Sequence, residues 1–294
     1  MNHDEVQLLA ARCLTEPTFL TKALELARAG RLTTTLEIPQ LNLDEVSAAT
    51  VFGLEELQRL ELFCGFVTKV KHGGVRKILP ATLRLIGHLD MELGFFVEFS
   101  KVYARARAGG PVPMEAHLLL LEEHLLPYLK HLSTSDRVLV RDVFLHEKAL
   151  WQAARAQGEA DGRDSEEGIA WRGRLLVQRF STDVVAVCQA LRQLAFRHGS
   201  YATDSDHLLA YWRAWEVTSV SMFEIDQLTA LIFSEVDGNR TIPDIAASLV
   251  RKGLPEITEQ ELGDFFEEAA VRGLVRLPVK AVSTGRLDGA NRLS

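Results

Sequence analysis

The sequence predicts an α+β fold, with an N-terminal all-helical domain followed by a smaller domain of short strands and three helices. Two observations predict this division. Leu and Ala dominate the chain while aromatic residues make up only 7%, which favours helix over strand. A polar, Gly-rich segment that begins at Gln157 interrupts the apolar patterning of the 294 residues. We therefore expect a helical domain over 1–157, a linker over 158–170, a second domain over 171–280 and a disordered tail over 281–294.

Apolar residues recur at helical spacing through the first half, where capping residues and prolines mark the helix starts. The expected helices are Asp4–Cys13, Pro17–Ala29, a segment opened by Asp44 that continues through Leu54–Phe63, Leu79–Ile86, Met91–Tyr103, Pro113–Leu126 and Ser135–Ala154. No repeat of fixed period occurs, which excludes a helical solenoid.

The second half begins with strand-like segments. Arg174–Phe180 and His207–Arg213 are predicted strands, and Trp215–Phe223 is a third with apolar and polar residues alternating at period two. Asp183–Phe196 has helical spacing and is predicted as a helix inserted after the first strand.

Three short helices are predicted after these strands. Asp226, Thr241 and Thr258 are residue types that cap helix N-termini, and Glu261 completes a capping box with Thr258. Gly-containing turns end the helices, and the segment after Gly273 is predicted to be a closing strand. This order of elements is typical of a winged-helix-like module, which binds a linear ligand, either nucleic acid or peptide.

Charge distinguishes between these two ligands. The third predicted helix carries five carboxylates, and its one arginine, Arg272, lies at the C-terminal end. The carboxylates are Glu259, Glu261, Asp264, Glu267 and Glu268. A helix in the DNA major groove needs Lys and Arg to replace counterions, and the chain has a net charge of −7. We therefore expect no nucleic acid partner, and two alternatives remain: a solvated acidic face without a partner, or a peptide-binding groove.

Three segments of the second half carry a family resemblance. The run Phe223 to Phe233, the turn and helix start Val236-Asp-Gly-Asn-Arg-Thr-Ile-Pro-Asp-Ile, and the ending Gly273-Leu-Val resemble the recognition element of pathways for ribosomally made, post-translationally modified peptides. The peptide chaperone of pyrroloquinoline quinone biosynthesis is the simplest member of that family. In the family, the leader peptide adds as a strand beside the third strand and lies against the third helix, so that main-chain hydrogen bonds give affinity and side-chain pockets give specificity.

The resemblance implies a leader-binding site on the third strand and the third helix of the second domain. Its residues in this chain are Ser219, Val220, Ser221, Met222, Phe223, Ile225, Phe265, Glu268 and Arg272.

Two segments of the first half carry a second resemblance. Ile78 to Phe96, continuing to Tyr103, and Leu126-Pro-Tyr-Leu-Lys-His-Leu followed by Asp142–Trp151 resemble the helix–Gly–helix core and the next segment of the helical partners of multinuclear non-haem iron oxidative enzymes. Those partners serve pathways of the methanobactin and 3-thiaglutamate kind and pair with a barrel-shaped iron enzyme. The resemblance implies a heterodimer with such an enzyme. His88 departs from the pattern, because an acidic residue often stands there in the family, and no binding role is carried over to it.

We expect the enzyme-docking surface in the first domain, because obligate partners bury large apolar patches. The expected residues are Phe95, Phe96, Tyr103, His117 and Leu121, in a half that has more apolar side chains than a monomer needs to expose. The alternative is that these residues fill the helical core.

The chain carries no catalytic or metal-binding motif. His117, His124 and His131 recur every seven residues, but no Glu-x-x-His pair accompanies them and Pro127 interrupts the helix before His131. We therefore expect no cofactor in this chain, with iron held by the partner enzyme.

Cysteine usage and hydropathy predict the compartment. Cys13, Cys64 and Cys188 are far apart in the sequence, which is typical of buried free thiols in a cytoplasmic protein. No apolar run reaches the length of a membrane span, so no membrane association is expected.

These observations predict a non-catalytic accessory subunit that binds the leader of a precursor peptide and presents it to an iron-dependent peptide-modifying enzyme in natural-product biosynthesis. Two alternatives belong to other classes. The first is a winged-helix transcriptional regulator with a helical sensor domain, against which the acidic third helix argues. The second is a metalloenzyme that uses the histidine series, against which the ligand spacing argues.

Overall fold

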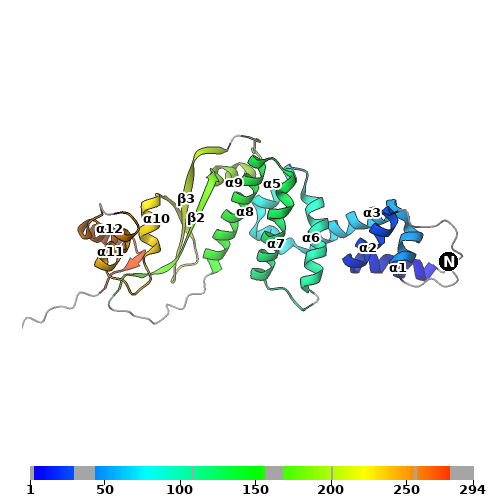
Figure 1. The fold of residues 1–294 in the computed structure, drawn as a ribbon, viewed down its shortest axis with the longest axis horizontal. Helices are drawn as coiled ribbons and strands as arrows, with labels where there is room; N and C mark the ends of the chain where they lie inside the picture. Colours follow the sequence, from blue (N-terminus) through cyan, green and yellow to red (C-terminus); the bar gives the residue numbers. More distant parts are fainter. Residues whose placement is uncertain are drawn as a thin grey trace, which may run out of the picture. The chain divides into compact units, whose positions relative to one another are not determined.

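The computed structural model describes residues 3–29, 44–107, 109–155, 168–199, 201–254 and 257–278. The chain is a mixed α+β protein with a small antiparallel sheet (Figure 1). It forms two compact units: unit 1 comprises 1–148 and 181–205, and unit 2 comprises 149–180 and 206–294. Residues 158–167 of the predicted linker 158–170 and the predicted tail 281–294 lie outside the described residues.

Unit 1 is built from helices (Figure 1). They are α1 (His3–Thr15), α2 (Pro17–Arg28), α3 (Glu45–Lys71), α4 (Gly73–Ile78), α5 (Pro80–His88), α6 (Glu92–Arg107), α7 (Met114–Tyr128), the 3₁₀ turn η1 (Leu129–His131), most of α8 (Thr134–Arg155) and α9 (Val184–Arg192). Each helix expected in the first half is present, and α4 was not expected. The α3 helix is two helices joined at Gly53, whose φ of 66° interrupts the helical geometry. The sequence predicted one helical segment that continues from Asp44 through Leu54–Phe63, so the break at Gly53 was not expected.

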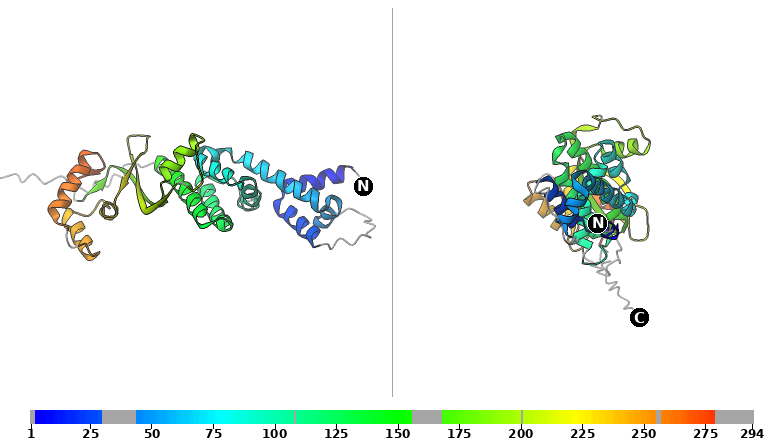
Figure 2. Two further views of the ribbon diagram at one scale, coloured as in Figure 1. Left: turned by 90° about the horizontal axis from the view of Figure 1, so that it is seen from above. Right: turned by 90° about the vertical axis from the view of Figure 1, so that its right-hand side faces the viewer.

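The α3 helix connects two apolar clusters of unit 1, because it packs on α1 and α2 at its first half and on α6 further along (Figure 2). The first cluster is formed by α1, α2 and the start of α3 around Leu9, Phe19 and Leu57, which are at most 1% exposed. Buried aromatic side chains of α6 and buried leucines of α7 lie in the second part of the unit. Among the described residues, no helix has the length and hydropathy of a membrane span.

Two buried carboxylates on α8 hold distant segments of unit 1 in place. Asp142 is 0% exposed and accepts hydrogen bonds from the Ser181 backbone N–H at 2.8 Å and the Thr182 hydroxyl at 3.2 Å. Glu147 accepts from the Ala81 and Thr82 backbone N–H groups at 2.8 Å, and so caps the start of α5. Buried carboxylates are stable only with such partners.

These hydrogen bonds explain why the domain boundary differs from the expected one. The segment 181–205, which includes α9, was expected inside the second domain but belongs to unit 1. Asp142 binds its first residues, and the Arg84 guanidinium donates to the Leu191 carbonyl at 3.2 Å. Such contacts join residues far apart in sequence, and the local pattern of 181–205 does not reveal them.

Unit 2 combines strands with three helices (Figure 1). The strands are β1 (Ala170–Trp171), most of β2 (Gly173–Thr182), most of β3 (Ala202–Ala214), β4 (Ser221–Ile225) and β5 (Val275–Arg276), and the helices are α10 (Gln227–Ser234), α11 (Ile242–Arg251) and α12 (Glu259–Val271). β1 pairs with β5, and β2, β3 and β4 form a second sheet in that order. The predicted strand Trp215–Phe223 starts later than expected, because residues 215–220 form the connection between β3 and β4.

The three predicted helix caps are confirmed. The Asp226, Thr241 and Thr258 side chains each accept a hydrogen bond from a backbone N–H three residues on, and the latter two form capping boxes.

A buried carboxylate joins α10 to α11. Glu235, 2% exposed, pairs with Arg240 and Lys252. Burial raises the pKa of Glu235, but hydrogen bonds from Lys252 and Ser248 and the positive charges nearby more than offset this, so its pKa lies below the usual value.

Close backbone approach makes Gly168 a sensitive position. A Cβ at Gly168 lies 2.5 Å from the Asn239 carbonyl carbon and the Gly238 carbonyl oxygen, where the 168–171 segment meets the α10–α11 turn. We predict that Gly168→Ala lowers the free energy of unfolding of unit 2 by about 1–3 kcal/mol, because backbone atoms have little room to move. Gly263→Ala is the matched control, because its Cβ meets nothing within 4 Å on α12. In urea unfolding the control should be neutral or stabilising by up to about 1 kcal/mol; equal midpoints for the two variants contradict the prediction.

Because His146 is buried, we predict that unit 1 loses stability in mild acid. It is 3% exposed, and burial lowers the pKa of His146 to about 4, with the nearby Arg192 charge acting in the same direction. The pKa of an imidazole in the unfolded chain is about 6.5, so the unfolded chain takes up the proton at a higher pH than the folded chain does. The free energy of unfolding of unit 1 should therefore fall by about 2 kcal/mol between pH 7 and pH 5. Burial raises the pKa of the neighbouring Glu147, which favours the folded state on acidification and opposes this loss.

Substitution of His146 isolates its contribution to the pH dependence of stability. His146→Gln removes the titrating ring, so its urea midpoint should fall less between pH 7 and pH 5 than that of the wild type. His131→Gln changes an exposed histidine and should follow the wild type. If all three proteins lose the same stability, His146 does not control this transition.

Candidate peptide-binding edge

The β4 strand forms one edge of the three-stranded sheet. It pairs antiparallel with β3, with Leu208 opposite Ile225, Ala210 opposite Phe223 and Trp212 opposite Ser221. Because the strand order is β2-β3-β4, no described strand pairs with the other side of β4. A strand edge of this kind presents backbone N–H and C=O groups to which an extended chain can add.

The two faces of β4 differ in burial. Phe223 and Ile225 are half-buried and pack against the core of unit 2, which the three helices and Trp212 supply. Met222 and Glu224 face the other way and are exposed. This period-two burial fixes the register of β4, since a slip by one residue would expose the apolar pair.

Phe265 of α12 joins the same core and lies 5.6 Å from Phe233, measured between ring centroids. Its partly buried ring therefore belongs to the cluster against which β4 packs. Glu268 and Arg272 lie at the C-terminal end of α12, are more than 60% exposed, and pair with each other at 2.5 Å.

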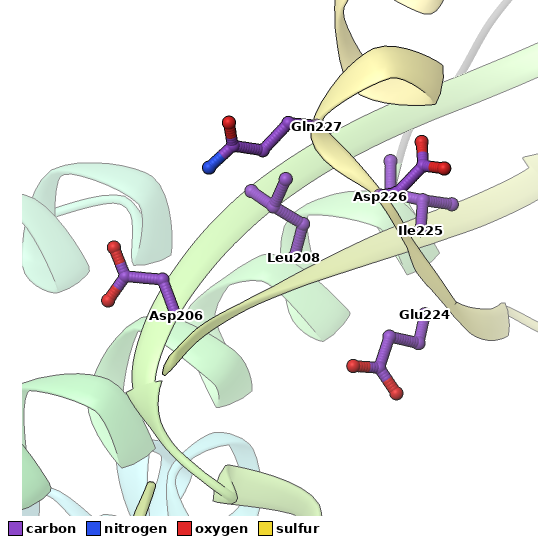
Figure 3. A pocket seen from close by; sticks show the side chains of 6 residues that line it. All are labelled: Asp206, Leu208, Glu224, Ile225, Asp226 and Gln227. Carbon is purple, nitrogen blue, oxygen red and sulfur yellow. The ribbon is translucent and has the colours of Figure 1, made fainter. Parts of the chain in front are cut away.

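An acidic pocket opens where β4 ends and α10 begins (Figure 3). Its volume is about 560 Å³, and its lining is supplied by β3, β4 and the first turn of α10. The lining residues are Asp206, Leu208, Glu224, Ile225, Asp226 and Gln227.

Three of these six residues are carboxylates. Glu224 contacts the His207 ring nitrogen at 2.8 Å, and Arg179 lies 3.6 Å from Asp206. Asp226 accepts from the Thr229 backbone N–H at 2.6 Å, and this hydrogen bond lowers the pKa of Asp226. Among the described residues, no lysine or arginine lines the pocket itself, although Arg179 pairs with Asp206 beside it; the three carboxylates favour a cationic group there.

The structure places the predicted peptide-binding residues in three groups. Ser221, Met222, Phe223 and Ile225 lie on β4, and Phe265, Glu268 and Arg272 lie on or directly after α12. Ser219 and Val220 lie in the connection before β4 and not on a strand. Sequence reasoning missed the pocket residues Asp206 and Glu224. Asp206 directly precedes one predicted strand and Glu224 directly follows another, and the β3–β4 pairing brings these ends together.

The predicted docking residues of unit 1 are not exposed. Phe95, Phe96 and Leu121 are at most 2% exposed and His117 is 6% exposed, so the expectation that they form an external surface is wrong. They fill the interior between α6 and α7, where the rings of Phe99 and His117 stack at 5.8 Å. Tyr103 is the exception, because it is partly exposed.

Tyr103 lines a second pocket of about 710 Å³ together with His72 and Arg107. The His72 and His117 rings lie 4.6 Å apart between centroids, and burial lowers the pKa of His117, which keeps the ring neutral. Within the described ranges, no group of three or more His, Cys, Asp or Glu residues is arranged to hold a metal ion.

Cys13, Cys64 and Cys188 are buried and form no disulfide. Burial raises the pKa of Cys13 to about 11 and that of Cys188 to about 12, so both are protonated thiols at neutral pH. Neither has the low pKa of a catalytic nucleophile.

Comparison of the chain with models of known protein families and with curated proteins gave no match. The candidate site is therefore defined by its own geometry: an edge strand, a half-buried aromatic core beneath it and an acidic pocket at one end.

Proposed function

We propose that this protein is a non-catalytic accessory subunit that binds the leader of a ribosomally made precursor peptide and presents it to an iron-dependent peptide-modifying enzyme. The observation that carries the proposal is the open edge of β4. In this proposal, β2–β4 and α10–α12 form a winged-helix-like peptide-recognition module, and the leader adds to β4 as a fourth strand of the sheet.

Backbone hydrogen bonding gives the proposed complex its affinity. β4 is five residues long, lacks Pro and starts with the small Ser221, so its backbone is accessible along the edge. Exposed apolar side chains lie on β4 and on the following helix α10. The exposed fractions are 38% for Met222, 39% for Leu228 and 38% for Leu231. They supply apolar contacts for a leader that follows β4 toward α10.

The acidic pocket gives the proposed complex its specificity. A leader strand beside β4 reaches Glu224 and Asp226 at the C-terminal end of the strand, where Lys or Arg side chains are favoured. The same carboxylates, with the acidic α12, disfavour nucleic acid and so argue against the transcriptional regulator.

Presentation rather than chemistry is the proposed contribution to the reaction. Holding the leader next to a partner's metal site raises the local concentration of the attached core peptide. Genes for a short precursor peptide and an iron enzyme beside the gene of this chain are expected under this proposal, and the absence of both contradicts it.

Strand addition is tested by proline substitution on β4. Adjacent backbone N–H groups of a strand point to opposite edges. Of the two substitutions Ser221→Pro and Met222→Pro, one therefore removes an N–H donor from the free edge, and the other removes a donor that faces β3 and disturbs the pairing with β3. We predict that the variant that keeps the wild-type unfolding midpoint loses binding of a fluorescently labelled leader, measured by polarisation. Thr218→Pro, in the β3–β4 connection, is the matched control and should bind. A folded protein that carries either β4 proline and binds with unchanged affinity rules out strand addition.

The acidic pocket is tested by a neutral substitution. Glu224→Gln should weaken binding of a Lys- or Arg-containing leader by up to about fivefold, because exposed ion pairs contribute only about 0–1 kcal/mol. The loss should be larger at low salt, where charges are less screened. Glu267→Gln removes the same charge from an exposed position on α12 and should leave the affinity unchanged. If Glu224→Gln and Glu267→Gln change the affinity for the leader equally, binding depends on net charge alone and the specific pocket is contradicted. Tight binding of duplex DNA would instead favour the transcriptional regulator.

A further inference from the structure

An exposed apolar stripe runs along the second half of α3. Leu62, Phe63, Phe66 and Val70 are 50%, 50%, 54% and 63% exposed. At 100° per residue they lie within an arc of about 100° on a helix that is continuous after Gly53. Four large apolar side chains at this exposure form a face that a monomer has no reason to present to water.

Charged groups border the stripe at each end. One turn before it, on the same face, Arg59 pairs with Glu55 and Glu56 at 2.6 Å. Two carboxylates and one guanidinium give this end one net negative charge.

The other end of the stripe has the opposite sign. Next to Val70, Lys69 contacts Glu92 at 2.5 Å, and Arg76 pairs with the same carboxylate. Two cations and one carboxylate give this end one net positive charge. If two copies of the chain pair antiparallel through this stripe, the negative end of each copy lies against the positive end of the other. The two copies are then related by a twofold axis near Phe66.

We propose that the α3 stripe is the interface between two copies of this chain, which pair antiparallel through Phe63, Phe66 and Val70. These three residues have the 3-and-4 spacing with which helices interlock side by side. A parallel arrangement would bring like charges together at both ends. The inference is independent of the proposed peptide binding.

The exposed area is sufficient for the core of such an interface. A Phe side chain contributes about 200 Å² when fully buried, so the two half-exposed rings alone present about 200 Å². With Leu62 and Val70 the patch reaches the range of about 300–600 Å² that marks interaction sites. The flanking charged residues supply the polar rim that ordinary interfaces have around such a core.

Sedimentation of the full chain tests the proposal. The wild type should change from monomer to dimer between about 1 and 100 μM. Phe66→Glu should raise the dissociation constant at least about 30-fold, because it puts two carboxylates at the centre of the interface. Leu119→Glu is the matched control, because Leu119 of α7 is 51% exposed and lies outside the stripe; it should dimerise like the wild type.

Disulfide trapping tests the arrangement. Phe66→Cys should form a covalent dimer under mild oxidation, because residue 66 lies next to its copy at the twofold axis, whereas Leu119→Cys should not. The three natural cysteines are buried and should not compete. If the wild type stays monomeric between about 1 and 100 μM, the proposal is overturned, and the stripe would then be a binding surface for a different protein. A dimer that survives Phe66→Glu, or equal trapping at 66 and 119, overturns it as well.

Discussion

Burial of alternate side chains of β4 is the constraint on which the candidate site depends. Phe223 and Ile225 pack against the helical core, and this fixes the register of β4 against β3. Once the register is fixed, Glu224 lies on the exposed face, and Asp206 and Asp226 lie at the same end of the sheet. The acidic pocket and the open edge therefore both follow from one pattern of burial. A strand without this alternation could slip, and neither feature would be defined.

Buried carboxylates give both units their internal connections. In unit 1, Asp142 and Glu147 bind backbone N–H groups of segments far away in sequence. In unit 2, Glu235 binds two cations and joins α10 to α11. Removing one partner from such an arrangement leaves a buried group unsatisfied, which costs more than the hydrogen bond contributes. These positions tolerate little change, whereas the charged residues on α12 are exposed.

Apolar residues of unit 1 show how far composition can be used to locate surfaces. The apolar side chains of α6 and α7 were expected to face a partner, with core filling as the alternative, and Phe95, Phe96 and Leu121 fill the interior. The exposed stripe lies instead on α3, at Leu62, Phe63, Phe66 and Val70. Which helix is covered on all sides depends on how the helices pack, and packing is not a local property.

Local signals in the sequence determined most of the secondary structure. Helix caps at Asp226, Thr241 and Thr258 and the alternation before Ile225 depend on nearby residues, so they were predicted from the chain alone, whereas the break at Gly53 was not predicted. Tertiary structure alone decided the membership of residues 181–205, the start of β4 at Ser221, the burial of Phe95 and Phe96, and the meeting of Asp206 with Glu224. The physical reason is that these features depend on contacts between residues that are distant in sequence, whose energies no local pattern records.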